Sequence, residues 1–118
     1  MIGRWLNGRE VWLYQPIIDF RKQMDGLIQV VASEMERRPT DGSFYLFRNR
    51  KKDKLKVVFW DRNGFWMGYK RLEKGHFDFP KDQVGKVSLS LEQLYLLISG
   101  LPMTKLNYFE TEKGMSFF

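Results

Sequence analysis

Three runs of strand-forming residues, joined by short turn sequences, occupy the middle of the chain and constrain its fold most strongly. The runs are SFYLF, KLKVVFW and FWMGYKRL, with RNRKKD and DRNG between them. Asn63-Gly64 is typical of a two-residue hairpin turn, because both residues tolerate the positive φ angles that this turn requires. Strands joined so closely pair antiparallel. We therefore predict an antiparallel β-meander that continues through the turn EKG into a further run, HFDFP.

Side chains alternate across a strand, so the loop lengths of the meander assign its residues to two faces. The first face resembles an ordinary core and comprises Phe44, Leu46, Leu55, Val57, Phe59, Trp66, Gly68 and Leu72. The second face is aromatic and comprises Tyr45, Phe47, Val58, Trp60, Met67 and Tyr69. Large aromatic side chains are usually buried, so we expect the second helix or another subunit to cover this face. The alternative is a partner-binding surface made of Tyr45, Phe47, Trp60, Met67 and Tyr69.

Helical periodicity occurs on both sides of the meander. Apolar residues recur at three- and four-residue spacing from Asp19 to about Met35, and either Asp19 or Asp25 could cap this helix. Gly26 favours either the later start or a close backbone approach, since glycine inside a helix costs about 1 kcal/mol relative to alanine. A second helix is predicted for the run SLEQLYLLISG, in which the first serine and the glutamine fit a capping box.

Two short strands, EVWLY before the first helix and KVSL before the second, complete the predicted elements. The fold class that follows is α+β, with an antiparallel β-meander sheet of four to five strands and two helices. A chain of 118 residues is long enough for one core. We predict a single domain over residues 1–102 and a C-terminal tail over residues 103–118 that is either frayed or docked.

The composition limits the chemistry available to the chain. It contains no cysteine, which excludes disulfides and thiolate metal sites and is typical of the reducing cytosol, so we predict a cytoplasmic protein. No apolar run reaches the ~18 residues of a membrane span, and we expect neither a signal peptide nor a membrane partner.

No catalytic constellation is recognisable in the sequence. The single histidine, His76, lies beside a turn, and turn or capping chemistry accounts for the candidate carboxylates Asp19, Asp25, Asp53, Asp61 and Asp78. Metal-ligand spacing and phosphate-binding glycine loops are absent from the sequence. We therefore predict a protein without enzymatic activity, metal or cofactor. A nuclease acting alone stays the third hypothesis, after the two binding functions described below.

Cations concentrate around the connection between the first two strands of the meander. The net charge is +6, and FRNRKKDKLK alone holds six lysines and arginines. Because burial of unpaired charge is prohibitive, we expect a solvent-exposed cationic hairpin tip formed by Arg48, Arg50, Lys51, Lys52 and Lys54. The residues that would extend this positive surface are Lys56, Lys70, Arg71 and Lys74. Two interpretations are open: contact with a nucleic-acid backbone, or a solvated turn without function.

Two blocks of the sequence carry a resemblance to a known family. They are DFRKQMDGL, residues 19–27, and FRNRKKDKLKVVFWDRNGFWMGYKRLEKGHFDFP, residues 47–80. The chain resembles the second-open-reading-frame accessory protein of the insertion sequence 66 family, often called TnpB. The family's pattern falls on Asp19, Arg21, Lys22, Asp25, Gly26, Leu27, Phe47, Arg48, Arg50, Lys54, Leu55, Lys56, Trp60, Asp61, Tyr69, Lys70, Arg71, Leu72, Glu73, Gly75, Phe77, Phe79 and Pro80. The likeness spans residues 11–101 and departs from the family at Gln23-Met24 and in a longer tail.

The resemblance implies an accessory factor in DNA transposition, encoded beside a separate transposase that carries the catalytic residues. It indicates the process and leaves the mechanism open. The leading hypothesis is non-specific binding of the DNA backbone through the basic hairpin. The alternative is a protein adaptor that binds the partner transposase through the aromatic sheet face. Salt separates the two, because phosphate contacts weaken steeply as salt rises and apolar contacts do not. The oligomeric state is left open.

Overall fold

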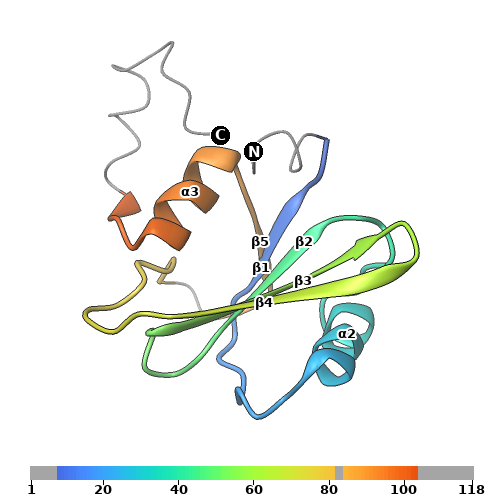
Figure 1. Cartoon of the computed structure of the whole chain (residues 1–118), viewed down its shortest axis with the longest axis horizontal. Helices are drawn as coiled ribbons and strands as arrows, with labels where there is room; N and C mark the ends of the chain where they lie inside the picture. Colours follow the sequence, from blue (N-terminus) through green and yellow to red (C-terminus); the bar gives the residue numbers. More distant parts are fainter. Residues whose placement is uncertain (1–7, 82–83, 104–118) are drawn as a thin grey trace.

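The computed structural model describes residues 8–81 and 84–103 as an α+β fold in which a sheet separates two helices (Figure 1). The strands are β1 (Val11–Tyr14), β2 (Phe44–Arg48), β3 (Lys54–Asp61), β4 (Gly64–Arg71) and β5 (Lys86–Leu89). The helices are α2 (Met24–Ser33) and α3 (Leu91–Ser99). The predicted fold class is confirmed. Residues 104–118 lie outside the described part, so the domain boundary at 102 and a docked tail stay predictions.

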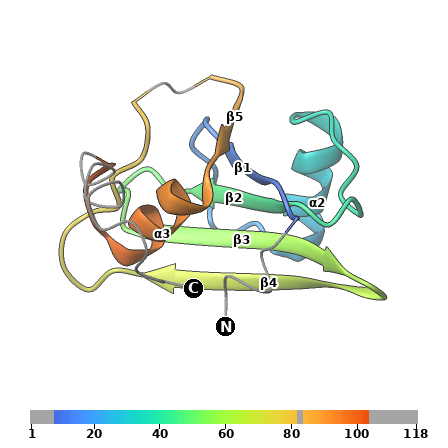
Figure 2. The same ribbon diagram turned by 90° about the horizontal axis from the view of Figure 1, so that it is seen from above.

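The five strands lie in the order β4-β3-β2-β1-β5, which Figure 2 shows as a stack. The meander is confirmed for β2, β3 and β4, which pair antiparallel. β1 pairs parallel with β2, whereas β5 pairs antiparallel with β1. The sheet is therefore mixed and not purely antiparallel. The parallel pair arises because the long connection between β1 and β2 passes through α2, and such a crossover returns the chain in the same direction.

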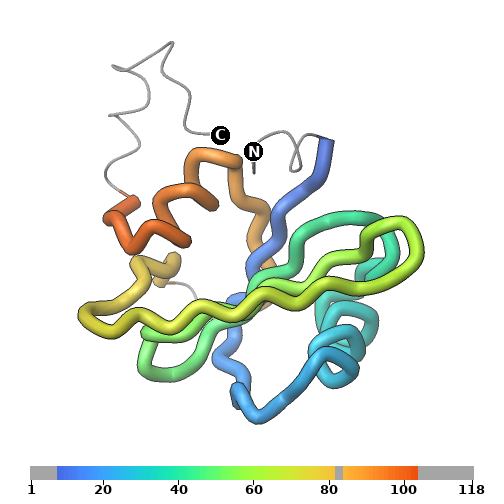
Figure 3. Tube along the Cα trace, in the orientation of Figure 1, coloured from blue at the N-terminus to red at the C-terminus, as the bar shows by residue number. Residues whose placement is uncertain are grey.

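The predicted continuation of the meander into HFDFP is wrong, because residues 76–80 form no strand. This segment instead lies at the end of the sheet that carries the β2–β3 turn (Figure 3). The Phe77 N–H donates to the Lys52 carbonyl oxygen at 2.7 Å. Phe77 and Phe79 are 1% and 6% exposed, with ring centroids 5.7 Å apart. Phe77 and Phe79 alternate with polar residues because both rings pack into the core, and the segment does so without pairing as a strand.

The predicted assignment of side chains to two faces is confirmed by the register of β3 and β4. Val57 lies opposite Gly68, and Val58 lies opposite Met67. A helix covers most of the aromatic face, as expected, but Tyr69 stays 52% exposed. The covering helix is α2 and not the helix predicted for SLEQLYLLISG, which is α3. The core on this side comprises Ile18, Leu27, Val30, Val31, Met35, Tyr45, Phe47 and Val58. α3 packs on the opposite face through Leu94 and Leu97.

The two helices begin in different ways. α2 starts at Met24, between the two candidate starts, and contains Gly26 in its first turn. Neither candidate aspartate caps it, and its N-cap Gln23 makes no side-chain cap hydrogen bond. α3 has the predicted capping box between Ser90 and Gln93. It ends at Gly100, whose φ of 72° lies in the left-handed region that glycine adopts without a steric cost.

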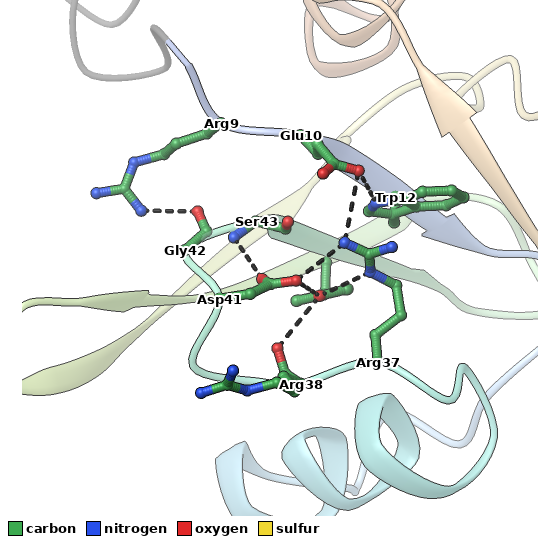
Figure 4. A network of polar contacts seen from close by, with 9 residues as sticks. Arg9, Glu10, Trp12, Arg37, Arg38, Asp41, Gly42 and Ser43 are labelled. Atoms are coloured by element: carbon green, nitrogen blue, oxygen red, sulfur yellow. Dashed lines mark hydrogen bonds and ion pairs between the residues drawn. The ribbon is translucent and has the colours of Figure 1, made fainter.

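A polar network joins the segment after α2 to β1 and β2 (Figure 4). Arg37 donates to the Tyr45 hydroxyl at 3.1 Å and to Asp41 at 2.9 Å. The same hydroxyl donates to Asp41 at 2.8 Å, and the Arg37 guanidinium lies 4.6 Å from the Trp12 ring. Burial raises the pKa of Tyr45. The network satisfies the polar end of a buried tyrosine and fixes α2 over the aromatic face.

Candidate nucleic-acid interface

The expectation that all cations of the hairpin tip face water is wrong for Arg48, which is 2% exposed. Its Nε donates to the Gln15 carbonyl oxygen at 2.7 Å, and its Nη1 donates to that of Pro80 at 3.0 Å. The guanidinium also lies 5.4 Å from the Phe79 ring centroid. Sequence reasoning assumed that this charge would have no buried partners. Backbone carbonyls and an aromatic face supply them, so Arg48 joins β2 to the segments after β1 and before β5.

Lys56 is also buried, at 2% exposure, and does not extend a positive surface. Its Nζ donates to the carbonyl oxygens of Phe20 and Lys22, each at 2.8 Å. The ammonium lies 5.0 Å from the Phe20 ring centroid and 5.5 Å from that of Tyr69. Burial, with a smaller effect from the charge of Lys54, lowers the pKa of Lys56. Lys56 therefore fixes the segment that precedes α2 against the sheet.

That segment and the β2–β3 turn form the two walls of a cleft of about 600 Å³. We call it the basic cleft; it is lined by Ile17, Ile18, Asp19, Phe20, Arg21, Asn49, Arg50, Lys51, Lys54 and Tyr69. Four of these residues are cations and one is a carboxylate. Three of the nine predicted cations, Arg50, Lys51 and Lys54, are thus brought together here, joined by Arg21 from the opposite wall.

The conformation of the β2–β3 turn separates Lys51 from Lys52. The Asn49 amide donates to Asp53 at 2.6 Å and accepts from the Lys54 N–H at 3.0 Å. Lys52 has a φ of 62°, and it lines a different hollow together with His76 and Asp78. The two consecutive exposed lysines therefore line different surfaces. The sequence pattern does not show this separation, because it depends on the conformation of the turn.

Arg21 and Asp19 form an exposed ion pair on the wall before α2. The Arg21 guanidinium donates through Nη2 to one Asp19 oxygen at 2.7 Å and through Nε to both, at 3.1 and 3.2 Å. Hydrogen bonds from the Arg21 side chain and N–H lower the pKa of Asp19 to about 2. The pair sets the guanidinium beside the cleft.

Tyr69 is the exposed aromatic residue of the basic cleft. It is 52% exposed, and its ring lies 6.1 Å from the Phe20 ring at an interplanar angle of 74°. The other predicted partner-binding residues are less accessible: Tyr45 and Phe47 are 0% exposed, and Trp60 and Met67 are partly buried. A partner surface made of all five side chains is therefore not accessible in this chain.

The remaining predicted cations do not line the basic cleft, although Arg71 lies opposite Lys54 in the sheet. The Lys70 Nζ donates to the Ile98 carbonyl oxygen at 2.6 Å, where a cation complements the C-terminal end of α3. Arg71 pairs with Glu73 at 2.9 Å. Lys74 is exposed in the loop after β4. Only a part of the predicted positive surface is therefore contiguous.

Sequence reasoning missed the wall before α2, which supplies Phe20 and Arg21 to the basic cleft. The sequence pattern indicated this segment only as a possible start of the first helix. A usable feature was present in the motif DFRK, in which an aromatic residue and two cations precede the first helical turn. Its place beside the β2–β3 turn depends on the buried Lys56, and no local pattern indicates such a long-range contact.

The opposite face of the sheet carries an apolar groove of about 350 Å³ beside α3. It is lined by Phe44, Leu46, Leu55, Val57, Phe59, Trp66, Met67, Gly68, Leu94 and Ile98. Gly68 contributes to its depth, because a Cβ at this position would lie 2.9 Å from the Val57 Cγ1. The groove and the basic cleft thus lie on different faces of the same hairpin.

Residues 8–81 and 84–103 hold neither a cluster of metal ligands nor a membrane-spanning helix. No three histidine or carboxylate side chains in these ranges come together in a way that could hold a metal ion. Neither α2 nor α3 has the length and apolar character that crossing a membrane requires.

The fold and the two surfaces described above define a small α+β protein, with a basic cleft on one face of its sheet and an apolar groove on the other. The chain belongs to the family described as IS66 Orf2 like protein, whose model matches residues 9–108. This confirms the resemblance seen in the sequence. Membership of this family implies an accessory role associated with transposition, in which the protein works together with a transposase.

Curated relatives share most of the chain. The uncharacterized protein y4jC of Sinorhizobium fredii is 36% identical over 89% of this chain and 89% of its own length. The uncharacterized protein y4hO of the same organism is 33% identical over 77% of this chain and 79% of its own. No solved structure matches the chain.

Proposed function

We propose that this transposition accessory protein binds the nucleic-acid backbone through the basic cleft, without strong sequence preference. The observation that supports it is the convergence of Arg21 with Arg50, Lys51 and Lys54 from segments far apart in the chain. A solvated turn needs no second wall, whereas a phosphate-binding surface benefits from cations held at both sides. The buried Lys56 holds one of these walls in place.

The physical basis is electrostatic. Cations that neutralise phosphates release condensed counterions, so affinity falls with salt by a slope of about 0.9 for each contact to duplex DNA. Such contacts position a protein on nucleic acid and carry no direct sequence information. The transposase would then recognise the end sequences of the mobile DNA element. This protein would add affinity for DNA to the complex that the two proteins form.

The sharpest test compares two neighbouring residues. Lys51→Gln and Lys52→Gln remove the same charge from the same turn, but only Lys51 lines the basic cleft. We expect Lys51→Gln to reduce the salt slope for a random-sequence duplex by about one contact, and Lys52→Gln to leave it unchanged. Equal effects of the two variants would favour a diffuse cationic tip over a cleft.

A larger change tests the proposal as a whole. The triple variant Arg50→Ala, Lys51→Ala, Lys54→Ala should lower the salt slope by about 2–3. A control with the same net charge replaces three cations elsewhere: Arg38→Ala, Arg62→Ala and Lys86→Ala. Binding by the control at wild-type affinity and slope supports the proposal. Loss of affinity that is equal in both variants, or wild-type binding by the triple variant, contradicts it.

The second candidate function is an adaptor that binds an apolar segment of the transposase in the apolar groove. The observation that favours it is the almost wholly apolar lining beside α3, together with the transposase that the family implies. Grooves of this kind bind by burial of apolar surface, which salt does not weaken.

Co-purification with the transposase distinguishes the adaptor from the DNA-binding function. Ile98→Gln places an amide in the apolar groove, and Ile28→Gln makes the same change on α2, away from it. The adaptor function predicts recovery of transposase at low and high salt without DNA, lost in Ile98→Gln and kept in Ile28→Gln. If the transposase is recovered only in the presence of DNA and is lost at high salt, the adaptor function is contradicted.

A further inference from the structure

We propose that the basic cleft takes single-stranded nucleic acid, with one base stacked on Tyr69 and the flanking phosphates on Arg50, Lys51 and Lys54. This inference rests on the proposed function and names the class of nucleic acid. The protein would then bind a strand whose bases are unpaired, as at a melted or nicked end, in preference to an intact duplex.

The first argument is the setting of the Tyr69 ring. Large aromatic side chains are usually buried, yet Tyr69 is 52% exposed in a cleft that four cations also line. The edge-to-face contact with Phe20 and the Lys56 ammonium, 5.5 Å from the ring centroid, hold the ring on one side. A ring fixed in this way loses little conformational freedom when a base stacks on its accessible part.

The second argument is size. A cleft of about 600 Å³ falls within the roughly 300–1,000 Å³ of pockets that enclose small molecules, so it can admit a nucleotide. A duplex keeps its bases stacked in its interior, so it would contact only the rim of the cleft. Tyr69 would then be of no use for binding.

The third argument is the combination of groups. Proteins that bind single strands without sequence preference combine a positive groove with aromatic rings, because every base has a face that can stack. Here the two features lie on one surface: the cations come from the β2–β3 turn and the tyrosine from β4, where Tyr69 faces the buried Lys56. The exposed Trp66 lies on the opposite face of β4 and lines the apolar groove, not the basic cleft.

Binding of three oligonucleotides by the wild-type protein tests the inference. The probes are a thymidine strand of about 12 nucleotides, within the span of known single-strand sites, an abasic strand with the same number of phosphates, and a duplex of the same length. We expect the thymidine strand to bind about 5-fold or more tightly than the abasic strand, because only the former can stack.

Variants on the two faces of β4 supply the second test. Tyr69→Ala should weaken binding of the thymidine strand about 5-fold or more and leave the salt slope unchanged, since no charge is lost. Tyr69→Phe keeps the ring and should bind as the wild type does. Trp66→Ala, which removes an exposed aromatic side chain from the opposite face, is the matched control and should also bind normally.

The outcomes separate this inference from the proposed function. If no probe binds, the proposed function itself is wrong. If the thymidine and abasic strands bind equally, or duplex binds more tightly than the thymidine strand, the inference is wrong and backbone binding stands. If Tyr69→Ala fails to fold, the comparison of the thymidine and abasic strands on wild-type protein still decides.

Discussion

The Nζ of Lys56 lies 2.8 Å from the carbonyl oxygen of Phe20, below the protein surface. This contact links β3 to the segment before α2, which is distant in sequence. It orients the wall of the basic cleft that carries Arg21. A lysine that was expected to contact a ligand is therefore a positioning residue, and the residues that it positions are the candidates for contact.

Replacement of Lys56 by methionine should destabilise the protein. Lys56→Met keeps most of the side-chain volume but leaves the carbonyl oxygens of Phe20 and Lys22 without their donor. We expect the free energy of unfolding to fall by about 1–3 kcal/mol, as for buried polar groups that lose a partner. Urea denaturation followed by circular dichroism measures this change.

The matched control is Lys52→Met, which makes the same chemical change at an exposed position of the same hairpin. It should change the free energy of unfolding by no more than about 0.5 kcal/mol. A Lys56→Met variant as stable as Lys52→Met would show that the ammonium does not hold the wall before α2.

The ion pair of Arg21 and Asp19 should have a measurable pH dependence. The folded-state pKa of Asp19, about 2, lies below the ordinary value of 3.8, so the pair contributes stability that is fully present above pH 3.8 and lost as the pH falls toward 2. Titration of the Asp19 carboxyl carbon by NMR should give a midpoint near 2. In Arg21→Ala the midpoint should rise toward the ordinary value, whereas an unchanged midpoint would exclude the guanidinium as the cause.

Gly68 should not tolerate alanine, although it lies in a strand. The new Cβ would lie 2.9 Å from the Val57 Cγ1, and a β-branched side chain has little freedom to move away. We expect Gly68→Ala to lower the free energy of unfolding by about 1–3 kcal/mol, as in overpacked cores. Gly64→Ala is the control in the same strand, because a Cβ there would meet no atom within 4 Å. Equal unfolding free energies for the two variants would contradict this account of the sheet.

Local patterns predicted those parts of the fold that local interactions determine. The β3–β4 hairpin and the Ser90–Gln93 capping box involve residues close in sequence, and both were predicted. The position of the turn was wrong by one residue: Gly64 already pairs with Asp61, so Arg62 and Asn63 form the turn, and Arg62 has the positive φ of 53°. The alternation of β3 and β4 also gave the correct faces, because a two-residue turn leaves little choice of register. The parallel pairing of β1 with β2 was missed, since it depends on how α2 packs across the sheet.

The candidate site was predicted less completely than the fold. A run of cations indicates positive charge but does not distinguish Arg48, which is buried by distant carbonyl groups, from Arg50, which is exposed. Nor does it show that Lys51 and Lys52 lie on different surfaces. These distinctions depend on the turn conformation and on long-range contacts, so only the folded chain reveals that Arg21 and Tyr69 complete the cleft.

The central claim is that nucleic acid binds in the basic cleft, and NMR mapping of the binding surface tests it most directly. We would titrate isotopically labelled protein with a thymidine strand of about 12 nucleotides, a length within the range of single-strand sites, and follow the backbone amides. The account predicts that the largest shifts fall on residues 17–21 and 49–54 and on Tyr69. Shifts that cluster instead around the Arg37 network or the apolar groove, or no shifts at saturating oligonucleotide, would contradict it.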